Sequence, residues 1–203
     1  DTRSGIMKRF NLIELNEVNF DIVRKYVEER PGYYQGFEKL LNLTSFNTSS
    51  EKSYDQIEPW IQWPSVHTCK TYAQHKIFRL GDIVNYTGEQ IFEKIERAGF
   101  FVGCVSPMNA SNKLKNPAYF IPDPWTNTVC DSSFTSRIVH RAIKQAVNDN
   151  SEGKINISTY IALGWVLLTK TQIKNWPTYA NLFLKRKKRW NKALFLDLLL
   201  TDI

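Results

Sequence analysis

The sequence predicts an α/β fold with a mostly parallel sheet, followed by a helical C-terminal segment. Three observations favour this fold class. An apolar run from Arg9 to Leu15 has the length of a buried strand and is followed by polar residues. A second apolar run, Phe100 to Val105, comes directly after an amphipathic segment, and an alternation of strand, helix and strand is typical of a parallel sheet. From Ser133 onward the apolar residues recur at helical spacing.

The segments after the first strand are predicted from spacing and from helix-breaking residues. Asn19 to Glu29 has helical spacing, and Pro31-Gly32 ends that helix. A second short helix is predicted over Gly36 to Leu43, and a polar loop or edge strand over Thr44 to Ser53. Gln56 to Tyr72 interleaves two prolines and two tryptophans with polar residues, which favours a fixed loop over a regular helix or a central strand.

The second half changes from mixed to helical character. Thr87 to Ala98 is predicted as an amphipathic helix that ends at Gly99. Residues 107–133 hold four prolines and are predicted as loops. The predicted helices that follow are Ser136 to Val147, Ile155 to Thr169, Thr171 to Phe183 and Trp190 to Leu200. We therefore divide the chain into a partial α/β core over 8–133 and a helical segment over 134–203, expected to be an insertion or cap of a longer protein.

Composition and charge exclude several classes of protein. The 203 residues carry 27 Lys and Arg against 20 Asp and Glu, a net charge of +7, and residues 168–203 account for +6 of it. The chain is thus a near-neutral piece followed by a basic segment, not a histone-like protein. No apolar run reaches the roughly 18 residues that a membrane-spanning helix needs. Three cysteines without CxxC spacing argue against a disulfide framework or a structural zinc site, and we expect a cytoplasmic protein.

Polar residues follow both predicted strands, where parallel sheets bind their ligands. Glu14 stands at the end of the first strand, and Asn109 stands after the second. The loop from Trp60 to Thr71 adds hydroxyl groups. A carboxylate at a strand end and a hydroxyl on a rigid loop suit metal-assisted attack on a phosphate or sulfate ester, because a metal lowers the pKa of the hydroxyl and neutralises the oxyanion.

Three segments, taken in order, resemble a known family. They are LIELNEVNFD (12–21), PWIQWPSVHTCKTYAQHKIF (59–78) and GEQIFEKIERAGFFVGCVSPMN (88–109). The first half of the chain resembles the N-terminal portion of the alkaline phosphatase superfamily, closest to its type I phosphodiesterase and nucleotide pyrophosphatase branch and to bacterial relatives. The resemblance implies a three-layer α/β/α hydrolase. It also implies two divalent ions, zinc or manganese, in the full-length protein, and a Ser or Thr that forms a covalent intermediate.

The resemblance also assigns roles by position. Glu14 resembles the first metal ligand, and Ser65 or Thr68 resembles the nucleophile. His75 resembles the histidine of the His-Gly corner that follows the nucleophile. His67, which lies beside both hydroxyls, is a candidate acid or base or a residue that orients the loop. A substrate oxygen is the proposed partner of Asn109.

Each candidate also has a structural interpretation. The carboxylate of Glu14 suits a helix cap or an ion pair, and the hydroxyls of Ser65 and Thr68 suit bonds to backbone. For His75 and His140 a structural role is the default. The family has Asp in place of Glu14 and Gly in place of Lys76, and these departures favour the alternative of a non-catalytic binding or assembly module. Core or lid packing is the default for Trp60 and Trp63, and a turn role for Asn109.

The basic run near the C-terminus has three interpretations. It consists of Lys185, Arg186, Lys187, Lys188 and Arg189, followed by Trp190 and an apolar stretch. It suits a solvated helix face, a contact with an anionic membrane surface, or a contact with nucleic acid, in that order. Because no nucleic-acid-binding motif accompanies the run, the membrane contact is the second choice, and it would make the protein peripheral to a membrane.

Overall fold

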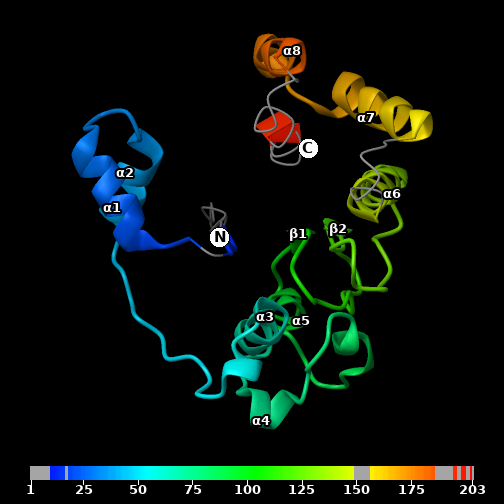
Figure 1. Cartoon of the computed structure of the whole chain (residues 1–203). Helices are drawn as coiled ribbons and strands as arrows, with labels where there is room; N and C mark the ends of the chain where they lie inside the picture. The colour runs from blue at the N-terminus through cyan, green and yellow to red at the C-terminus, as the bar shows by residue number, and fades with distance from the viewer. Residues whose placement is uncertain are drawn as a thin grey trace, which may run out of the picture. The chain divides into compact units, whose positions relative to one another are not determined.

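The computed structural model describes residues 10–16, 18–148, 156–185, 194–195, 198–199 and 202 (Figure 1). The chain divides into two compact units, residues 1–50 and residues 51–203, and each is described by itself.

The first unit contains two helices, α1 (Phe20–Glu29) and α2 (Gln35–Leu41). The side chain of Asn19 caps α1 by accepting hydrogen bonds from the backbone N–H groups of Asp21 and Ile22, at 2.9 and 3.2 Å. Gly32 in the turn between the helices has φ +78°, a conformation that glycine adopts without steric cost. Neither helix buries a residue completely.

The strand predicted over Arg9 to Leu15 is wrong for the part that the structure describes. Residues 10–15 form neither helix nor strand, and Phe10 and Ile13 are each 76% exposed. The physical reason is that a strand exists only through hydrogen bonds to a neighbouring strand. The described residues of this unit include no strand that could pair with residues 10–15.

The second unit begins with short helices and a small sheet. These elements are η1 (Tyr54–Gln56), α3 (Pro59–Thr68), α4 (Tyr72–His75), η2 (Asp82–Asn85), α5 (Ile91–Arg97), β1 (Gly103–Val105) and β2 (Tyr119–Ile121). Three longer helices and a short turn follow: α6 (Phe134–Asn148), α7 (Ile157–Lys170), η4 (Ile173–Asn175) and α8 (Trp176–Leu184).

The predicted three-layer α/β/α fold is also wrong. The described chain is mostly helical, and its sheet has only the two parallel strands β1 and β2, in the register Gly103 to Tyr119 and Val105 to Ile121. The strand expected over Phe100 to Val105 is confirmed in its second half. β2 arises in a segment predicted as loop, and α3 forms in the segment predicted as a fixed loop. Both depend on contacts that are distant in sequence.

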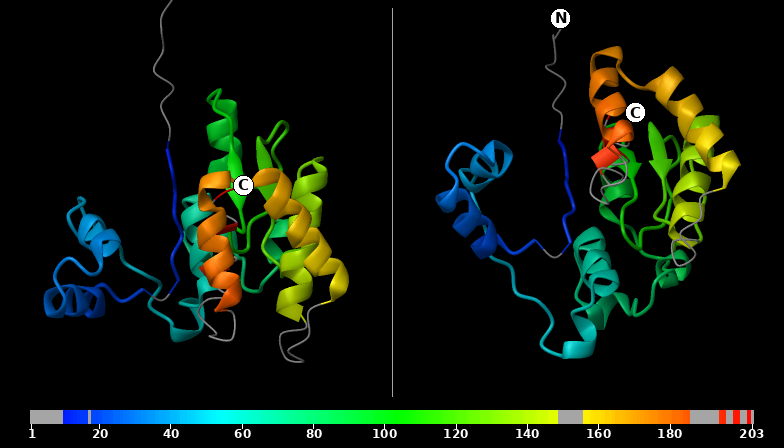
Figure 2. Two further views of the ribbon diagram at one scale, coloured as in Figure 1. Left: turned by 90° about the horizontal axis from the view of Figure 1, so that it is seen from above. Right: turned by 45° about the horizontal axis from the view of Figure 1, so that its top comes forward.

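Two clusters of buried apolar side chains lie on the two sides of β2. Phe120 packs with α5 and β1, in the cluster Phe92, Val102, Cys104, Ala110 and Phe120. Ile121, the next residue, packs with the C-terminal helices, in the cluster Ile121, Val139, Val166, Tyr179 and Leu199. Successive side chains of a strand point to opposite faces, so β2 joins the two halves of the unit. Figure 2 shows α6 beside the sheet and α7 beside α6.

The helices predicted from apolar spacing in the C-terminal segment are confirmed by α6, α7 and α8. The helix predicted over Trp190 to Leu200 lies mostly outside the described residues. No helix within the described ranges is long and apolar enough to cross a membrane. The division predicted at residue 133 stays a prediction about a longer protein.

Candidate active site

Helix α3 carries three of the predicted catalytic residues. Pro59 stands at its first turn, where a missing N–H costs nothing. Cys69 ends the helix in the left-handed conformation, with φ +55°, and its N–H donates to the carbonyls of Ser65 and Val66. Lys70 N–H donates to the Ser65 carbonyl as well, at 3.3 Å. This arrangement is a helix C-cap without the usual glycine.

A proline inside α3 is compensated by a distant asparagine. Pro64 has no N–H to donate to the carbonyl of Trp60, four residues earlier. The Nδ2 group of Asn109 donates to that carbonyl at 2.7 Å, and also to the Arg79 carbonyl at 3.1 Å. Its Oδ1 accepts from Gly81 N–H at 2.9 Å. This buried amide therefore supplies the donor that the proline lacks and joins α3 to the turn at 79–81.

The substrate-binding role of Asn109 stays a prediction, but the geometry accounts for the residue structurally. Asn109 is 0% exposed and has φ +49°. Asparagine is among the few residues that tolerate this left-handed conformation. Its amide makes three bonds to backbone, so both of its amide hydrogens and its oxygen are engaged within the fold.

Asp123, which was not predicted as a site residue, holds Asn109 in place. The Oδ2 atom of Asp123 accepts from Asn109 N–H and from the Thr126 hydroxyl, each at 2.7 Å. Its Oδ1 accepts from the N–H groups of Trp125 and Thr126, at 2.7 and 2.6 Å. The sequence does carry one signal for this residue. An aspartate commonly forms an Asx turn, in which its side chain accepts from the backbone N–H groups two and three residues later.

Ser65 and His75 are brought together by α3 and α4. Helix α4 begins at a capping box between Thr71 and Gln74, and the carboxylate of Glu51 accepts from Tyr72 N–H at 2.7 Å. This turn places the imidazole Nε2 of His75 2.9 Å from the hydroxyl Oγ of Ser65. His75 is 4% exposed, whereas Ser65 is half-buried and so remains accessible to solvent.

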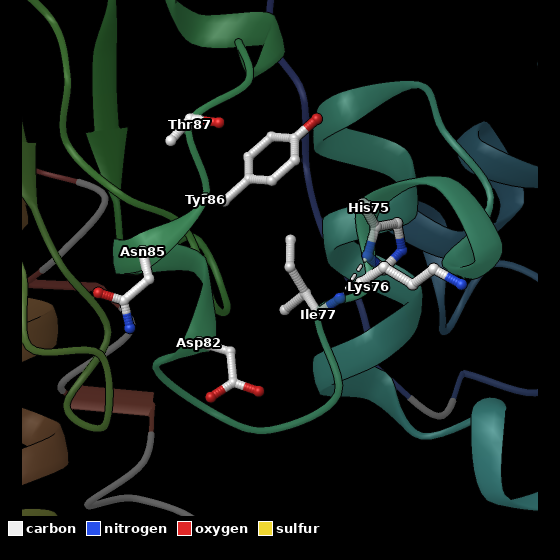
Figure 3. Close-up of a pocket in the computed structure, with 7 residues that line it drawn as sticks. All are labelled: His75, Lys76, Ile77, Asp82, Asn85, Tyr86 and Thr87. Atoms are coloured by element: carbon white, nitrogen blue, oxygen red, sulfur yellow. Dashed lines mark hydrogen bonds between the residues drawn. The ribbon is translucent and has the colours of Figure 1, made fainter.

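The backbone decides which nitrogen of His75 carries the proton. Ile77 N–H donates to the Nδ1 atom of His75 at 2.9 Å, the dashed line in Figure 3. Nδ1 therefore carries a lone pair, and in the neutral ring the proton is on Nε2. Nε2–H donates to the Oγ of Ser65, and the Ser65 hydroxyl donates to the Ile61 carbonyl at 3.3 Å. His75 is thus a hydrogen-bond donor to the serine and not its base.

Burial favours the neutral form of His75. Desolvation lowers the pKa of His75 below its ordinary value of 6.5; the carboxylate of Glu51 opposes this shift, and the ammonium of Lys70 adds to it. Protonation at Nδ1 would also break the bond from Ile77 N–H, since two donors would then face each other.

We expect stability to fall as the pH is lowered through the pKa values of His75 and His140. Burial lowers the pKa of both below 6.5. At pH values between the folded and the unfolded pKa, the unfolded chain binds more protons than the folded chain. The contribution of the neutral histidines to the free energy of unfolding is therefore complete above pH 6.5 and is lost as the pH falls from there through the folded pKa. Denaturant unfolding across this range measures the effect, and a H75Q variant should show a weaker pH dependence. An equal slope in that variant contradicts a role for His75.

Lys76 holds the backbone conformation that the resemblance associates with glycine. It has φ +60°, in the left-handed region where a side chain is sterically costly. The corner after His75 therefore keeps a glycine-type geometry although the residue is lysine.

We expect Lys76→Gly to raise the free energy of unfolding by about 0.5 to 1 kcal/mol, because glycine removes the left-handed penalty but loses more entropy on folding. Urea unfolding measures the change. Lys76→Ala is the control, since alanine removes the same ammonium group and retains the penalty. An equal gain in the alanine variant would assign the effect to the lost charge.

Thr68 and His67 lie deeper than Ser65. Thr68 is 1% exposed, and its hydroxyl donates to the Pro64 carbonyl at 2.6 Å. His67 is 0% exposed and packs between the rings of Trp63 and Phe92, with centroid distances of 6.2 and 5.1 Å. Of the two predicted nucleophiles, Ser65 is the less deeply buried.

A cavity of about 330 Å³ lies beside His75 (Figure 3). The residues that line it are His75, Lys76, Ile77, Asp82, Asn85, Tyr86 and Thr87. Asp82 accepts from Arg79 N–H at 2.9 Å, and the ring of Tyr86 lies 5.6 and 5.4 Å from the ammonium groups of Lys70 and Lys113. The cavity thus offers polar groups of both signs next to the Ser65–His75 pair.

The remaining predicted site residues lie elsewhere. Glu14 is half-buried in the first unit, whereas the five other residues given site roles belong to the second. Among the described residues, no group of three or more His, Cys, Asp or Glu side chains is placed to hold a metal ion. His140 lies on α6 with its Nε2 3.3 Å from the Asp123 carbonyl. Lys185 is exposed at the end of α8, and residues 186–189 lie outside the described residues.

Comparison of the chain with protein-family models, with curated proteins and with solved structures finds no match. Function is therefore inferred from the site itself and from the resemblance of its segments.

Proposed function

We propose that this chain contributes to a metal-dependent hydrolase of phosphate or sulfate esters in which Ser65 is the nucleophile. The observation that carries the proposal is the 2.9 Å contact between Ser65 Oγ and His75 Nε2. The resemblance selected these two residues separately, ten positions apart. Their contact, on a surface that solvent reaches at Ser65, supports a shared role.

In the proposed reaction, Ser65 Oγ bonds to the phosphorus or sulfur atom as the bond to the leaving oxygen breaks. The serine proton passes to solvent water, because Nε2 of His75 already carries a proton and the Ile61 carbonyl is not a base. The leaving oxygen takes a proton from water, and a second water then cleaves the bond from Oγ to phosphorus or sulfur, which releases the acid product and restores the serine. His75 holds Oγ in position and stabilises the negative charge that develops on it through the Nε2–H bond.

A divalent ion would supply the missing activation, because it lowers the pKa of a hydroxyl and neutralises an oxyanion. Glu14, which belongs to the first unit, stays a ligand candidate from the sequence alone, because a carboxylate oxygen is a common ligand for zinc and manganese. The described residues do not form a complete ligand set, so the other ligands are not assigned.

The test is hydrolysis of p-nitrophenyl phosphate, bis-p-nitrophenyl phosphate and p-nitrophenyl sulfate by the full-length protein, with zinc, with manganese and with a chelator. We expect turnover of at least one ester that depends on the metal and falls in Glu14→Ala. Metal-independent turnover overturns the metal requirement, and no turnover of any ester overturns the enzymatic proposal.

A binding or assembly module without catalysis is the second candidate. It is favoured by the hydrogen bonds of Ser65, which engage its hydroxyl as donor to Ile61 and as acceptor from His75 within the fold. Calorimetric titration separates the two candidates. A full-length protein that binds neither zinc nor manganese fits the module and excludes the hydrolase.

A further inference from the structure

Helix α7 turns an apolar stripe toward solvent. Ile157, Ile161 and Leu168, at spacings of four and seven residues, lie on one side of the helix and are 78%, 68% and 66% exposed. Thr159 and Val166, on the opposite side, are buried at 5% and 0%. A surface helix of a globular protein normally carries polar residues on its solvent side, so this stripe needs a partner.

Further exposed apolar side chains follow along the chain in η4 and α8. Ile173 in η4 is 76% exposed. In α8, Phe183 and Leu184 are 51% and 77% exposed, whereas Tyr179 is buried against the core. Trp176, 39% exposed at the start of α8, adds a large aromatic side chain. Figure 2 shows α7 and α8 following one another at the edge of the second unit.

The charged residues of this stretch of chain are all basic. Residues 153–196 contain nine Lys and Arg and no Asp or Glu. Lys170, Lys174 and Lys185 are exposed on or beside the two helices. Asp202 is packed against this stretch, but it is only 9% exposed and accepts hydrogen bonds from Gln172 N–H and from Asn175. Its carboxylate therefore closes the turn between α7 and α8 and does little to offset the positive surface.

We propose that the exposed apolar side chains of α7, η4 and α8, together with Lys170, Lys174 and Lys185, form a docking surface for a membrane that contains anionic lipids. This α7–α8 surface combines apolar side chains, which enter the boundary between headgroups and acyl chains, with lysines, which pair with lipid phosphates. Trp176 adds partly exposed aromatic surface at the same boundary, and its indole N–H donates to the Thr171 hydroxyl at 3.1 Å.

Charge complementarity selects this partner over two others. A second copy of the chain would bring its own lysines against these lysines, with no acidic residue from 153–196 to oppose them. Nucleic acid would pair with the lysines but would leave the side chains of Ile157, Ile161 and Leu168 in water. An anionic bilayer satisfies both the charge and the apolar stripe.

The test is co-sedimentation of the full chain with vesicles of phosphatidylcholine alone, or with phosphatidylglycerol added at about one lipid in four. We expect binding to the anionic vesicles that weakens as salt is added, because salt screens the lysines. A double variant K170E and K174E is expected to lower the partition by at least about 25-fold, since each lysine near such a surface contributes about five-fold. I161S with L168S should lower it too.

Matched controls are K52E and V129S, which change an exposed lysine and a 69% exposed valine away from these helices. They should bind as the unaltered chain does, and circular dichroism should show all variants folded, because every substituted side chain is exposed. Equal binding to neutral vesicles, or no loss in the α7–α8 variants, overturns the proposal. Self-association that disappears in I161S with L168S, without vesicle binding, assigns the surface to a second copy instead.

Discussion

Ser65→Ala is expected to lower metal-dependent ester hydrolysis by about 1,000-fold or more, because no other group can take the place of an attacking hydroxyl. The steady-state kcat on the best of the three p-nitrophenyl esters measures the loss. Thr68→Ala is the discriminating comparison. Thr68 is buried and donates to the Pro64 carbonyl, so its replacement should cost stability and leave kcat within a few-fold. If Thr68→Ala abolishes turnover and Ser65→Ala does not, the nucleophile assignment is wrong.

Two substitutions of His75 separate a positioned donor from a general base. Glutamine places an N–H group close to where Nε2–H lies, whereas alanine removes the donor. We expect His75→Gln to retain kcat within about ten-fold and His75→Ala to lose about 100-fold. The pH–rate profile should show no limb that belongs to His75, because Nε2 donates in both of its protonation states. Equal losses in the two variants, with such a limb present, would make His75 the base.

Asn109→Ala is expected to lower the free energy of unfolding by about 3 to 5 kcal/mol, the largest stability effect that we predict. The substitution leaves the carbonyls of Trp60 and Arg79 and the N–H of Gly81 without the amide that bonds them. It also places alanine at φ +49°. Asn109→Asp should be at least as damaging, because an oxygen would then face the two carbonyl oxygens. Denaturant unfolding measures both variants.

A double-mutant cycle with Pro64 tests the origin of this effect. Pro64→Ala restores an N–H that can donate to the Trp60 carbonyl within α3, so it should recover about 1 kcal/mol more in the Asn109→Ala background than in the unaltered chain. The two effects would add within about 0.5 kcal/mol if Asn109 did not replace the missing donor. That result would contradict the compensation inferred for Pro64.

The local elements that were predicted well are those with internal hydrogen bonds. The helix expected over Thr87 to Ala98 is present over its second part as α5 (Ile91–Arg97), and the helical spacing after Ser133 corresponds to α6, α7 and α8. Each satisfies its backbone within the segment, so apolar spacing and end signals suffice to locate it. The strand over Arg9 to Leu15 and the three-layer fold were wrong, because strands depend on partners that spacing along one segment does not reveal.

The candidate site was predicted in part. Ser65 and His75 were both singled out, and they lie 2.9 Å apart. The role of His75 was not predictable, since its tautomer is set by the N–H of Ile77. Asp123 was missed because its four hydrogen bonds become visible only once the segment around Trp125 is folded.

The sequence by itself determined the charge distribution, the helices of the C-terminal half and the identity of the hydroxyl and imidazole groups available for chemistry. Only the tertiary structure decided that a segment with two prolines becomes the helix α3. The physical reason is that Pro64 removes a hydrogen bond that the helix cannot replace from within, and Asn109, 45 positions later, replaces it from outside. The exposure of the apolar stripe on α7 was decided in the same way, because burial is a property of how helices pack and not of their spacing alone.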